Sequence, residues 1–266
     1  MLRETIRCLR QYTRHADTEF VVADDGSTDG TRTMLEAEAV PVVTGVNMGV
    51  AWNKNRVLYL LGQIRRCEVV IMLEDDTMPD RPGWEDAWIE AATSWGHVNY
   101  AAPWLADRAV SGQGLPADPF LATEVTAQCA AWTREALDWA GYFDSRFRGY
   151  GHEHVEHARR LIRAGYGGTD HDRVLFAAIG GGVTVHPAVS HGSADEVARN
   201  LGLAHQAMAD GSWRAPWRNL AELKQFRSEI DRALASRPAG FALHRPAPPA
   251  PARRFGWLAR LFRWRR

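Results

Sequence analysis

Two groups of acidic residues each follow an apolar run of sequence. They are Asp24 and Asp25, just before Ser27, and Glu74, Asp75 and Asp76. Neighbouring carboxylates repel one another unless a cation compensates them, and hard divalent ions such as Mg²⁺ or Mn²⁺ take oxygen ligands. The second group therefore predicts a metal that bridges to a substrate diphosphate, with a solvated acidic turn as the alternative. For the first group, the alternative to a ligand site is a turn that caps a helix.

A third group, Glu153 and His154, stands at the glycine-flanked start of a predicted helix. The helix dipole favours a carboxylate in the first turn, and a Glu beside a His also suits general-base catalysis. The zinc-protease spacings fail, because they require His at position 156 or 153, where Glu156 and Glu153 stand.

The elements that position these residues alternate along the first half of the chain. They are a strand at 18–25, a helix at 31–39, a strand at 41–45, a helix at 50–65 and a strand at 68–76. This alternation predicts an α/β fold with a Rossmann-like, mostly parallel sheet flanked by helices. Ligands bind beyond the carboxyl ends of such strands, so residues 1–100 are interpreted as a nucleotide-binding half.

Residues 101–236 are interpreted as an acceptor half, with an irregular region after Pro103. Helices are predicted at 134–140 and 152–165, and residues 193–236 also have a helical pattern. In the helix at 152–165, the core side is expected to hold Leu161 and Ile162, and the side facing mostly outward Arg159, Arg160 and Arg163.

Composition limits the class of protein. The chain has 266 residues, 45% hydrophobic and 24% charged, which excludes a disordered or collagen-like chain. The first residues have no apolar core of a signal peptide, and no apolar run reaches the roughly 20 residues of a membrane span. Three cysteines without a CxxC pair predict a reducing compartment and no disulfide framework.

A linker and a basic tail are predicted after residue 236. Residues 237–252 are rich in Pro and Ala, as in a semi-extended linker. Residues 253–266 carry six Arg and no acid, so residues 1–252 have a net charge of −6, because the whole chain has 32 basic and 32 acidic residues. That balance argues against nucleic acid as a partner. Drawn as a helix, the tail has one apolar and one basic side, which predicts contact with an anionic membrane surface; a disordered basic end is the alternative.

Four motifs occur in an order that resembles family 2 glycosyltransferases with the GT-A fold. They are VVADDGSTDGT, Asn47-Met48-Gly49 with Asn55 beyond it, MLEDDTMP, and GYFDSRFRGYGHEHVEHARRLIRAGY. The resemblance covers about residues 4–190. It implies a metal-dependent, inverting transfer of a sugar from a nucleotide-diphospho-sugar of the UDP or GDP type to a hydroxyl of a glycan, lipid-linked or protein acceptor. The cysteines predict a cytoplasmic protein, and the tail places it on the inner face of the membrane if it is an anchor.

The resemblance implies roles for individual residues. Asp25, with Asp24 beside it, holds the nucleobase. The nucleotide pocket is lined by Ser27, Asn47, Gly49, Lys54 and Asn55, with Glu74 or Asp75 toward the ribose. Asp76 is the ligand of Mn²⁺ or Mg²⁺, and His191, with His186 as second choice, completes the metal shell. Glu153 is the general base, with His154, which replaces the family's Asp, as the alternative.

Two further expectations concern the strand order and the acceptor. Family members begin with a strand that lies between those carrying Asp25 and Asp76, and this sequence starts inside the helix that follows it. Either the true start lies upstream, or the chain is a shortened copy. Trp84 and Trp88 are expected in the core because they share one helical face, and the acceptor contacts are predicted to be Trp104 and Trp132.

Two rival functions are open from the sequence. A nucleotidyltransferase of related fold would use a Gly-rich phosphate loop and basic residues near the first strand, which the sequence does not show. A truncated homologue would keep a carbohydrate-binding or partner-binding surface without turnover. Nucleotide binding that depends on Mn²⁺ distinguishes the enzyme from the inactive homologue.

Overall fold

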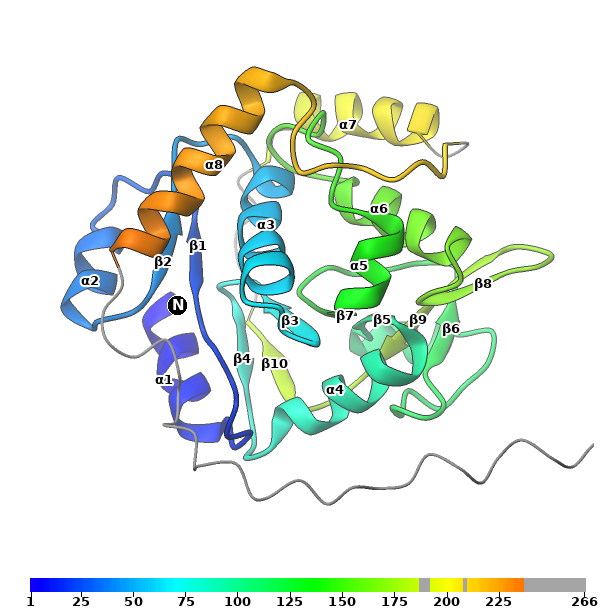
Figure 1. Cartoon of the computed structure of the whole chain (residues 1–266). Coiled ribbons are helices and arrows are strands. Elements are labelled where there is room, and N and C mark those ends of the chain that lie inside the picture. The colour runs from blue at the N-terminus through cyan, green and yellow to red at the C-terminus, as the bar shows by residue number, and fades with distance from the viewer. Residues whose placement is uncertain (187–191, 208–209, 237–266) are drawn as a thin grey trace, which may run out of the picture.

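The computed structural model describes residues 1–186, 192–207 and 210–236 (Figure 1). Helices and strands alternate in the first part, as the sequence predicts. They are α1 (Leu2–Tyr12), β1 (Val22–Asp24), α2 (Thr31–Ala37), β2 (Val42–Thr44), α3 (Val50–Leu58), β3 (Val69–Leu73), β4 (Thr77–Pro79), α4 (Trp84–Trp95) and β5 (His97–Tyr100). The helix predicted at 50–65 is confirmed in position, because α3 continues directly into the π-helical segment η1 (Tyr59–Ile64).

The second part contains the irregular region and four more helices among the described residues. Its elements are the 3₁₀ segment η2 (Pro103–Arg108), β6 (Phe120–Ala122), β7 (Cys129–Thr133), α5 (Arg134–Ala140), α6 (Glu153–Arg163), β8 (Gly168–Asp170), β9 (Val174–Ile179), β10 (Val183–Val185), α7 (Ala194–Ala207) and α8 (Leu220–Ala235). The helical pattern of residues 193–236 is confirmed by α7 and α8, and the stretch before α8 contains Pro216, which cannot donate a helical hydrogen bond.

The strands form a mixed sheet with most of its inner strands in one direction. The larger sheet has the order β3–β7–β5–β9–β6, with β8 paired to β9. β3 and β5 both run antiparallel to β7, and β9 runs parallel to β5, so β3, β5 and β9 point the same way. β1 and β2 form a separate parallel pair. The α/β class with a helix-flanked sheet is therefore confirmed, with β7 inserted in the opposite direction.

The sheet is interrupted between β1 and β3. Among the described strands, β1 pairs only with β2, and β3 pairs only with β7. Apolar side chains fill the gap between β1 and β3. Val21 before β1 and Met72 of β3 belong to the same apolar clusters as Trp52 and Leu58 of α3. The interruption lies where the family resemblance expects a further strand.

Helices cover both faces of the sheet (Figure 1). Trp84 and Trp88 of α4 pack with Val98 and Ile179 on one face, which confirms their predicted place in the core. On the other face, Leu137 of α5 and Leu161 of α6 pack with strand residues such as Val70. α8 lies against β2 and α3, where Phe226 and Ile230 contact Val43 and Trp52. None of the helices in the described ranges is long and apolar enough to cross a bilayer.

The outward placement of Arg160 is wrong. Its side chain is almost fully buried in α6, where it pairs with Glu156 at 2.9 Å (Nε–Oε1) and donates to the carbonyl oxygens of Ala140 and Tyr142. A buried guanidinium needs such partners, and an acid one turn earlier in the helix supplies the charge. Arg163 is exposed and Arg159 is half-buried, and Leu161 and Ile162 are buried as expected.

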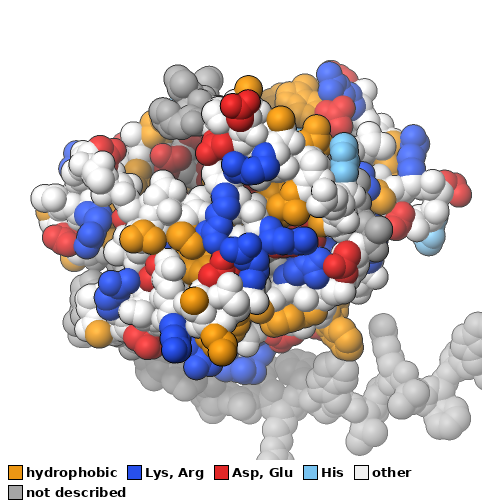
Figure 2. All heavy atoms as spheres, turned by 90° about the horizontal axis from the view of Figure 1, so that it is seen from above, with side chains coloured by type: hydrophobic (Ala, Val, Ile, Leu, Met, Phe, Trp, Pro, Cys, Tyr) orange, Lys and Arg blue, Asp and Glu red, His pale blue; other side chains and the backbone are white. Residues whose placement is uncertain are grey.

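Figure 2 shows the molecule from above, toward the face that carries α7, α8 and the loop before α6. Lys and Arg side chains gather in the middle of this face, with hydrophobic side chains beside them.

Candidate active site

Asp25 joins the end of β1 to the start of α3. Its carboxylate accepts hydrogen bonds from the backbone N–H groups of Met48 (3.0 Å) and Gly49 (2.8 Å), and Arg56 Nη1 lies 2.8 Å from Oδ1. Gly49 has a φ of 91°, and a Cβ there would lie 2.4 Å from the backbone nitrogen of Gly149. Only glycine fits this close approach of two loops.

Asp24 is also held by the chain itself. The side chain is buried and accepts hydrogen bonds from Thr44 Oγ1 (2.6 Å) and the backbone N–H of Ser27 (3.1 Å). Burial alone would raise the pKa of Asp24, but the hydrogen bonds from Ser27 and Thr44 outweigh it and lower the pKa. The predicted pocket residues Ser27 and Asn47 are both exposed, and the backbone N–H of Ser27 contacts the Asp24 carboxylate. Their side chains are therefore open to solvent.

Arg56 was not predicted as part of the site, and it connects Asp25 to α8. It is fully buried and pairs with both Asp25 and Glu229, the latter at 3.0 Å (Nε–Oε2). It also donates to the carbonyl oxygen of Val46 at 2.9 Å. Glu229 in turn accepts a hydrogen bond from Trp52 Nε1 at 3.0 Å. The signal in the sequence that could have found Arg56 is that a charged residue occurs among the apolar positions of the predicted helix at 50–65.

Asn55, predicted to line the nucleotide pocket, lies in the core. Its amide donates to the carbonyl oxygen of Phe143 and accepts from the N–H of the same residue, both at 2.9 Å. This pair of bonds fixes the loop after α5 against α3. Asn55 therefore supports the site from behind and has no exposed surface for a ligand.

The acidic group after β3 has three different environments. Lys54 Nζ lies 2.7 Å from Glu74 Oε1. Asp75 is exposed, and its backbone carbonyl oxygen accepts a hydrogen bond from Thr5 Oγ1 at 3.0 Å, which ties α1 to this turn. Asp76 is half-buried, and its carboxylate accepts from Thr77 Oγ1 at 3.2 Å.

Asp76 offers the donor chemistry that a divalent cation needs. Within the described ranges its carboxylate has no Lys, Arg or His ion-pair partner, so its oxygens remain available at the end of the strand. His186 lies beside it, with its backbone N–H donating to the carbonyl oxygen of Asp76 at 2.8 Å. No group of three His, Cys, Asp or Glu side chains converges among the residues described. His191 lies outside the described residues.

Glu153 is the most buried of the predicted catalytic groups, at 3% exposure. It lies at the first residue of α6, where its carboxylate accepts from the N–H of Gly151 at 3.1 Å. Lys54 Nζ and His154 Nδ1 each lie 3.6 Å from its Oε1. Burial alone would raise the pKa of Glu153, but the hydrogen bond with His154 and the charges of Lys54 and His154 lower it to about 2.

Lys54 therefore connects the two predicted groups. Its side chain is buried and lies over the ring of Phe143, with 5.6 Å between Nζ and the ring centroid. Burial would lower the pKa of the ammonium, but the carboxylates of Glu74 and Glu153 outweigh it and raise the pKa. The sequence interpretation placed Lys54 in the nucleotide pocket, whereas the side chain links the acidic turn to the start of α6.

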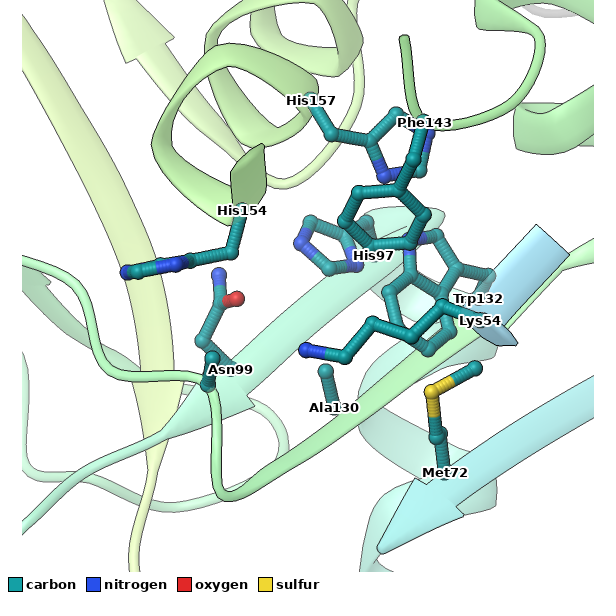
Figure 3. A pocket seen from close by; sticks show the side chains of 10 residues that line it. Lys54, Met72, His97, Asn99, Ala130, Trp132, Phe143, His154 and His157 are labelled. Carbon is teal, nitrogen blue, oxygen red and sulfur yellow. The ribbon is translucent and has the colours of Figure 1, made fainter. Parts of the chain in front are cut away.

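Behind His154 lies a small enclosed cavity. Its volume is about 10 Å³, roughly one water molecule. Figure 3 shows Lys54 pointing toward it from one side and His154 and Asn99 from the other, with His97, His157 and Trp132 behind. Trp132 is 3% exposed and stacks on His97 with ring centroids 5.0 Å apart. The predicted acceptor residue Trp132 is thus part of the core, whereas Trp104 is exposed and lies under the guanidinium of Arg108.

The two inner histidines are neutral members of the core. Burial lowers the pKa of His97 to about 4 and the pKa of His157 well below its ordinary value. His97 Nδ1 is 2.9 Å from the carbonyl oxygen of Ala131, and His157 Nε2 is 2.9 Å from that of Gly141. His154 is the histidine of this group whose side chain reaches solvent, at 25% exposure.

Comparison with known proteins agrees with this arrangement. The sequence model of Glycosyl transferase family 2 matches residues 1–89, which contain both acidic groups. Nothing among the curated proteins matches the chain.

Two solved structures are similar over most of the chain. One is the mannosyltransferase PcManGT from Pyrobaculum calidifontis in complex with GDP-Man and Mn²⁺, with 19% identity, a TM-score of 0.54, and coverage of 88% of this chain and 69% of that one. The other is GalNAc-T7 with UDP, GalNAc and Mn²⁺, with 13% identity, a TM-score of 0.53, and coverage of 88% and 53%. The fold is therefore that of a GT-A glycosyltransferase. The match over residues 1–89, out of 266, agrees with the resemblance of the motifs to family 2 glycosyltransferases.

Proposed function

We propose that this protein transfers a sugar from a nucleotide-diphospho-sugar to a hydroxyl acceptor with inversion at the anomeric carbon. The observation that carries the proposal is the link from Glu74 through Lys54 to Glu153, with Nζ distances of 2.7 and 3.6 Å. This link brings the acidic turn, whose carboxylates suit a cation and its diphosphate, next to Glu153 and His154, one of which can act as a general base. An in-line displacement needs these two groups on opposite sides of the reacting carbon.

The general base in this proposal is His154. Glu153 has a pKa of about 2, is buried and lies beside Lys54, so it is a weak proton acceptor in this state. His154 reaches solvent, and its Nδ1 faces the Glu153 carboxylate at 3.6 Å. Glu153 then orients the imidazole and stabilises the imidazolium that forms when Nε2 takes the proton of the acceptor hydroxyl. Glu153 as the base is the alternative, and it requires loss of the contact with Lys54.

Asp76 would hold the divalent cation, with His186 or His191 as the second ligand. Its half-buried carboxylate, without a basic partner among the described residues, supports this role. When bound, Mn²⁺ or Mg²⁺ neutralises the negative charge that builds on the departing diphosphate. The two similar structures are described with Mn²⁺, which agrees with the choice of ion.

The donor nucleotide is proposed to lie between the ends of β1 and β3. Ser27 and Asn47 provide exposed polar side chains, and Asp25 keeps the loop at 47–49 in place. The carboxylate of Asp25 already accepts from two backbone N–H groups and Arg56, which favours a supporting role over direct contact with the base. The two similar structures are described with GDP-Man and with UDP and GalNAc, so both donor types enter the test.

The acceptor side is proposed to include Trp104 on η2, whose indole is exposed and flanked by Arg108. The proposed acceptor is a hydroxyl of a glycan, a lipid-linked sugar or a protein. The basic tail at 253–266 is proposed to contact an anionic membrane from the cytoplasmic side; it lies outside the described residues.

Calorimetric titration of UDP and GDP, with and without MnCl₂, tests the proposal. We expect binding that depends on Mn²⁺ and is lost in Asp76→Ala, because the cation joins the carboxylate to the diphosphate. Glu90→Ala, an exposed carboxylate on α4 outside the acidic turn, is the control. A folded parent chain that binds neither nucleotide would favour the inactive homologue.

A further inference from the structure

The face shown in Figure 2 carries a cluster of arginines that the proposed reaction does not use. We call it the arginine cluster, and its members are Arg146, Arg148, Arg199, Arg214 and Arg218. They come from the loop before α6, from α7 and from the segment before α8.

Two buried carboxylates hold four of the five arginines. The first acid is Asp144, whose Oδ2 lies 2.5 Å from Arg146 Nη2 and 3.3 Å from Arg214 Nε. The second acid is Glu222 of α8, which lies 2.9 Å from Arg148 Nη2 and 2.5 Å from Arg218 Nη2. Arg199 joins them by donating to the backbone carbonyl oxygen of Arg148 at 2.6 Å. Each acid is covered by two guanidinium groups, so positive charge faces the solvent.

The charge count of this face is positive. The five arginines are opposed by Asp144, Glu222, Asp210 and Glu196, the last of which lies against Gly149, and this leaves a charge of +1. α8 adds to the positive charge of this face. Its acids Glu222 and Glu229 are buried in ion pairs with arginines and contribute little negative charge to the surface. The side chains on its outer side line a shallow groove; the charged ones are Lys224, Arg227, Asp231 and Arg232, with a charge of +2.

Large apolar side chains are exposed among these cations. The exposed fraction is 48% for Tyr150, 38% for Leu201, 51% for Trp213 and 74% for Leu220. Tyr150 belongs to the same loop as Arg148, and both of their carbonyl oxygens accept from Asn200 of α7 at 3.0 Å. Trp213 precedes Arg214, and Leu220 begins α8. Figure 2 shows hydrophobic side chains next to the central Lys and Arg groups.

We propose that this face binds the surface of an anionic lipid bilayer. Arginines attract lipid phosphates, and exposed Trp, Tyr and Leu side chains gain free energy in the headgroup region, so the mixture fits a bilayer better than a purely polar polyanion. Residues 253–266, which lie outside the described residues, also combine Trp, Leu and Phe with six Arg.

Sedimentation of the full chain with vesicles tests the surface. The vesicles are phosphatidylcholine alone or phosphatidylcholine mixed with phosphatidylglycerol. The test variant is Arg199→Glu/Arg227→Glu, because neither side chain pairs with a buried carboxylate. We expect binding only to the anionic vesicles, and a loss of at least about tenfold in the variant, since each basic residue near such a surface contributes measurably. High salt should weaken the binding of the parent.

The matched control is Arg66→Glu/Arg173→Glu. Both residues are exposed; Arg66 follows η1, and Arg173 lies on the β8–β9 hairpin, on the opposite side of the molecule from α8 in Figure 1. The control should bind like the parent. A second pair of variants tests how much the exposed apolar side chains contribute to vesicle binding. Leu220→Ser should weaken the binding, and Leu115→Ser, which changes another exposed leucine, should not.

Three results would overturn the proposal. The first is equal vesicle binding by the parent and the Arg199→Glu/Arg227→Glu variant with unchanged thermal midpoints. The second is an equal loss in the control variant, which would indicate a general charge effect. The third is binding to a single-stranded oligonucleotide, lost in the test variant, without any binding to vesicles. Donor hydrolysis is measured in parallel and should be the same in all variants, so a failure of this surface is distinct from a failure of the enzyme assignment.

Discussion

Lys54 of α3 and Glu153 of α6 face each other at 3.6 Å in the buried floor between the acidic turn and the candidate base. Lys54 also lies 2.7 Å from Glu74, so one ammonium serves two carboxylates from different parts of the chain. Replacing it by an apolar side chain would leave Glu153 buried without a cation.

Lys54→Met should therefore destabilise the protein by roughly 3 kcal/mol at neutral pH. Glu153 has a pKa lowered to about 2, so in the parent its stabilising contribution is complete above the ordinary pKa of Glu and is lost as the pH falls toward 2. In the variant, burial raises this pKa. The stability difference between parent and variant should shrink from pH 7 to pH 4.

Urea unfolding at several pH values measures this difference. Lys224→Met, at an exposed position of α8, is the control and should stay within about 0.5 kcal/mol of the parent. A stability loss in Lys54→Met that does not change with pH would contradict the pairing with Glu153.

The core histidines predict a second pH effect. His97 is buried with its pKa lowered to about 4, so protonation in the unfolded chain opposes folding once the pH falls below about 6.5. The resulting loss between pH 6.5 and 4 is roughly 3 kcal/mol for a shift of this size. His97→Gln should be less stable than the parent at pH 7 and should show a smaller loss on acidification. Parallel stability curves for the two proteins would argue against a neutral His97.

The Arg56 contacts predict that α8 supports the nucleotide site. Arg56→Met should cost roughly 3–5 kcal/mol, because it leaves Asp25 and Glu229 without their buried cation. Glu229→Gln keeps an acceptor for Trp52 and should cost less. Denaturant midpoints measure both, with Ser228→Ala, at an exposed position of the same helix, as the reference. Equal stability of Arg56→Met and the parent would rule out this role.

The sequence could predict what depends on local pattern. Apolar runs located β1 and β3, and the acids after them marked the strand ends at which we propose that ligands bind. It could not predict that Lys54 reaches Glu153, because the approach of α3 and α6 is set by packing over the whole sheet. Arg160 was placed outward because helical spacing predicts the side of the helix on which a residue lies, but not the groups that it contacts. In the structure, Glu156 and two carbonyl oxygens accept hydrogen bonds from its guanidinium, and they make its burial favourable.

The roles of the two catalytic candidates can be separated by kinetics. His154→Ala should lower kcat by about 10²- to 10⁴-fold, the usual contribution of a general base, with little change in nucleotide affinity. Glu153→Gln should lower kcat less and should shift the pH at which activity is half-maximal, because it acts through His154. Full activity in His154→Ala would return the role of base to Glu153.

The central claim is that the acidic turn after β3 and the start of α6 form one active site for sugar transfer. Turnover of a panel of UDP-sugars and GDP-sugars, followed as nucleotide release with MnCl₂, tests it most directly in three proteins: the parent, Asp76→Ala and Glu90→Ala, the last an exposed carboxylate on α4. We predict that the parent and Glu90→Ala hydrolyse the same donor at similar rates and that Asp76→Ala does not. Equal turnover by Asp76→Ala and the parent would contradict the claim.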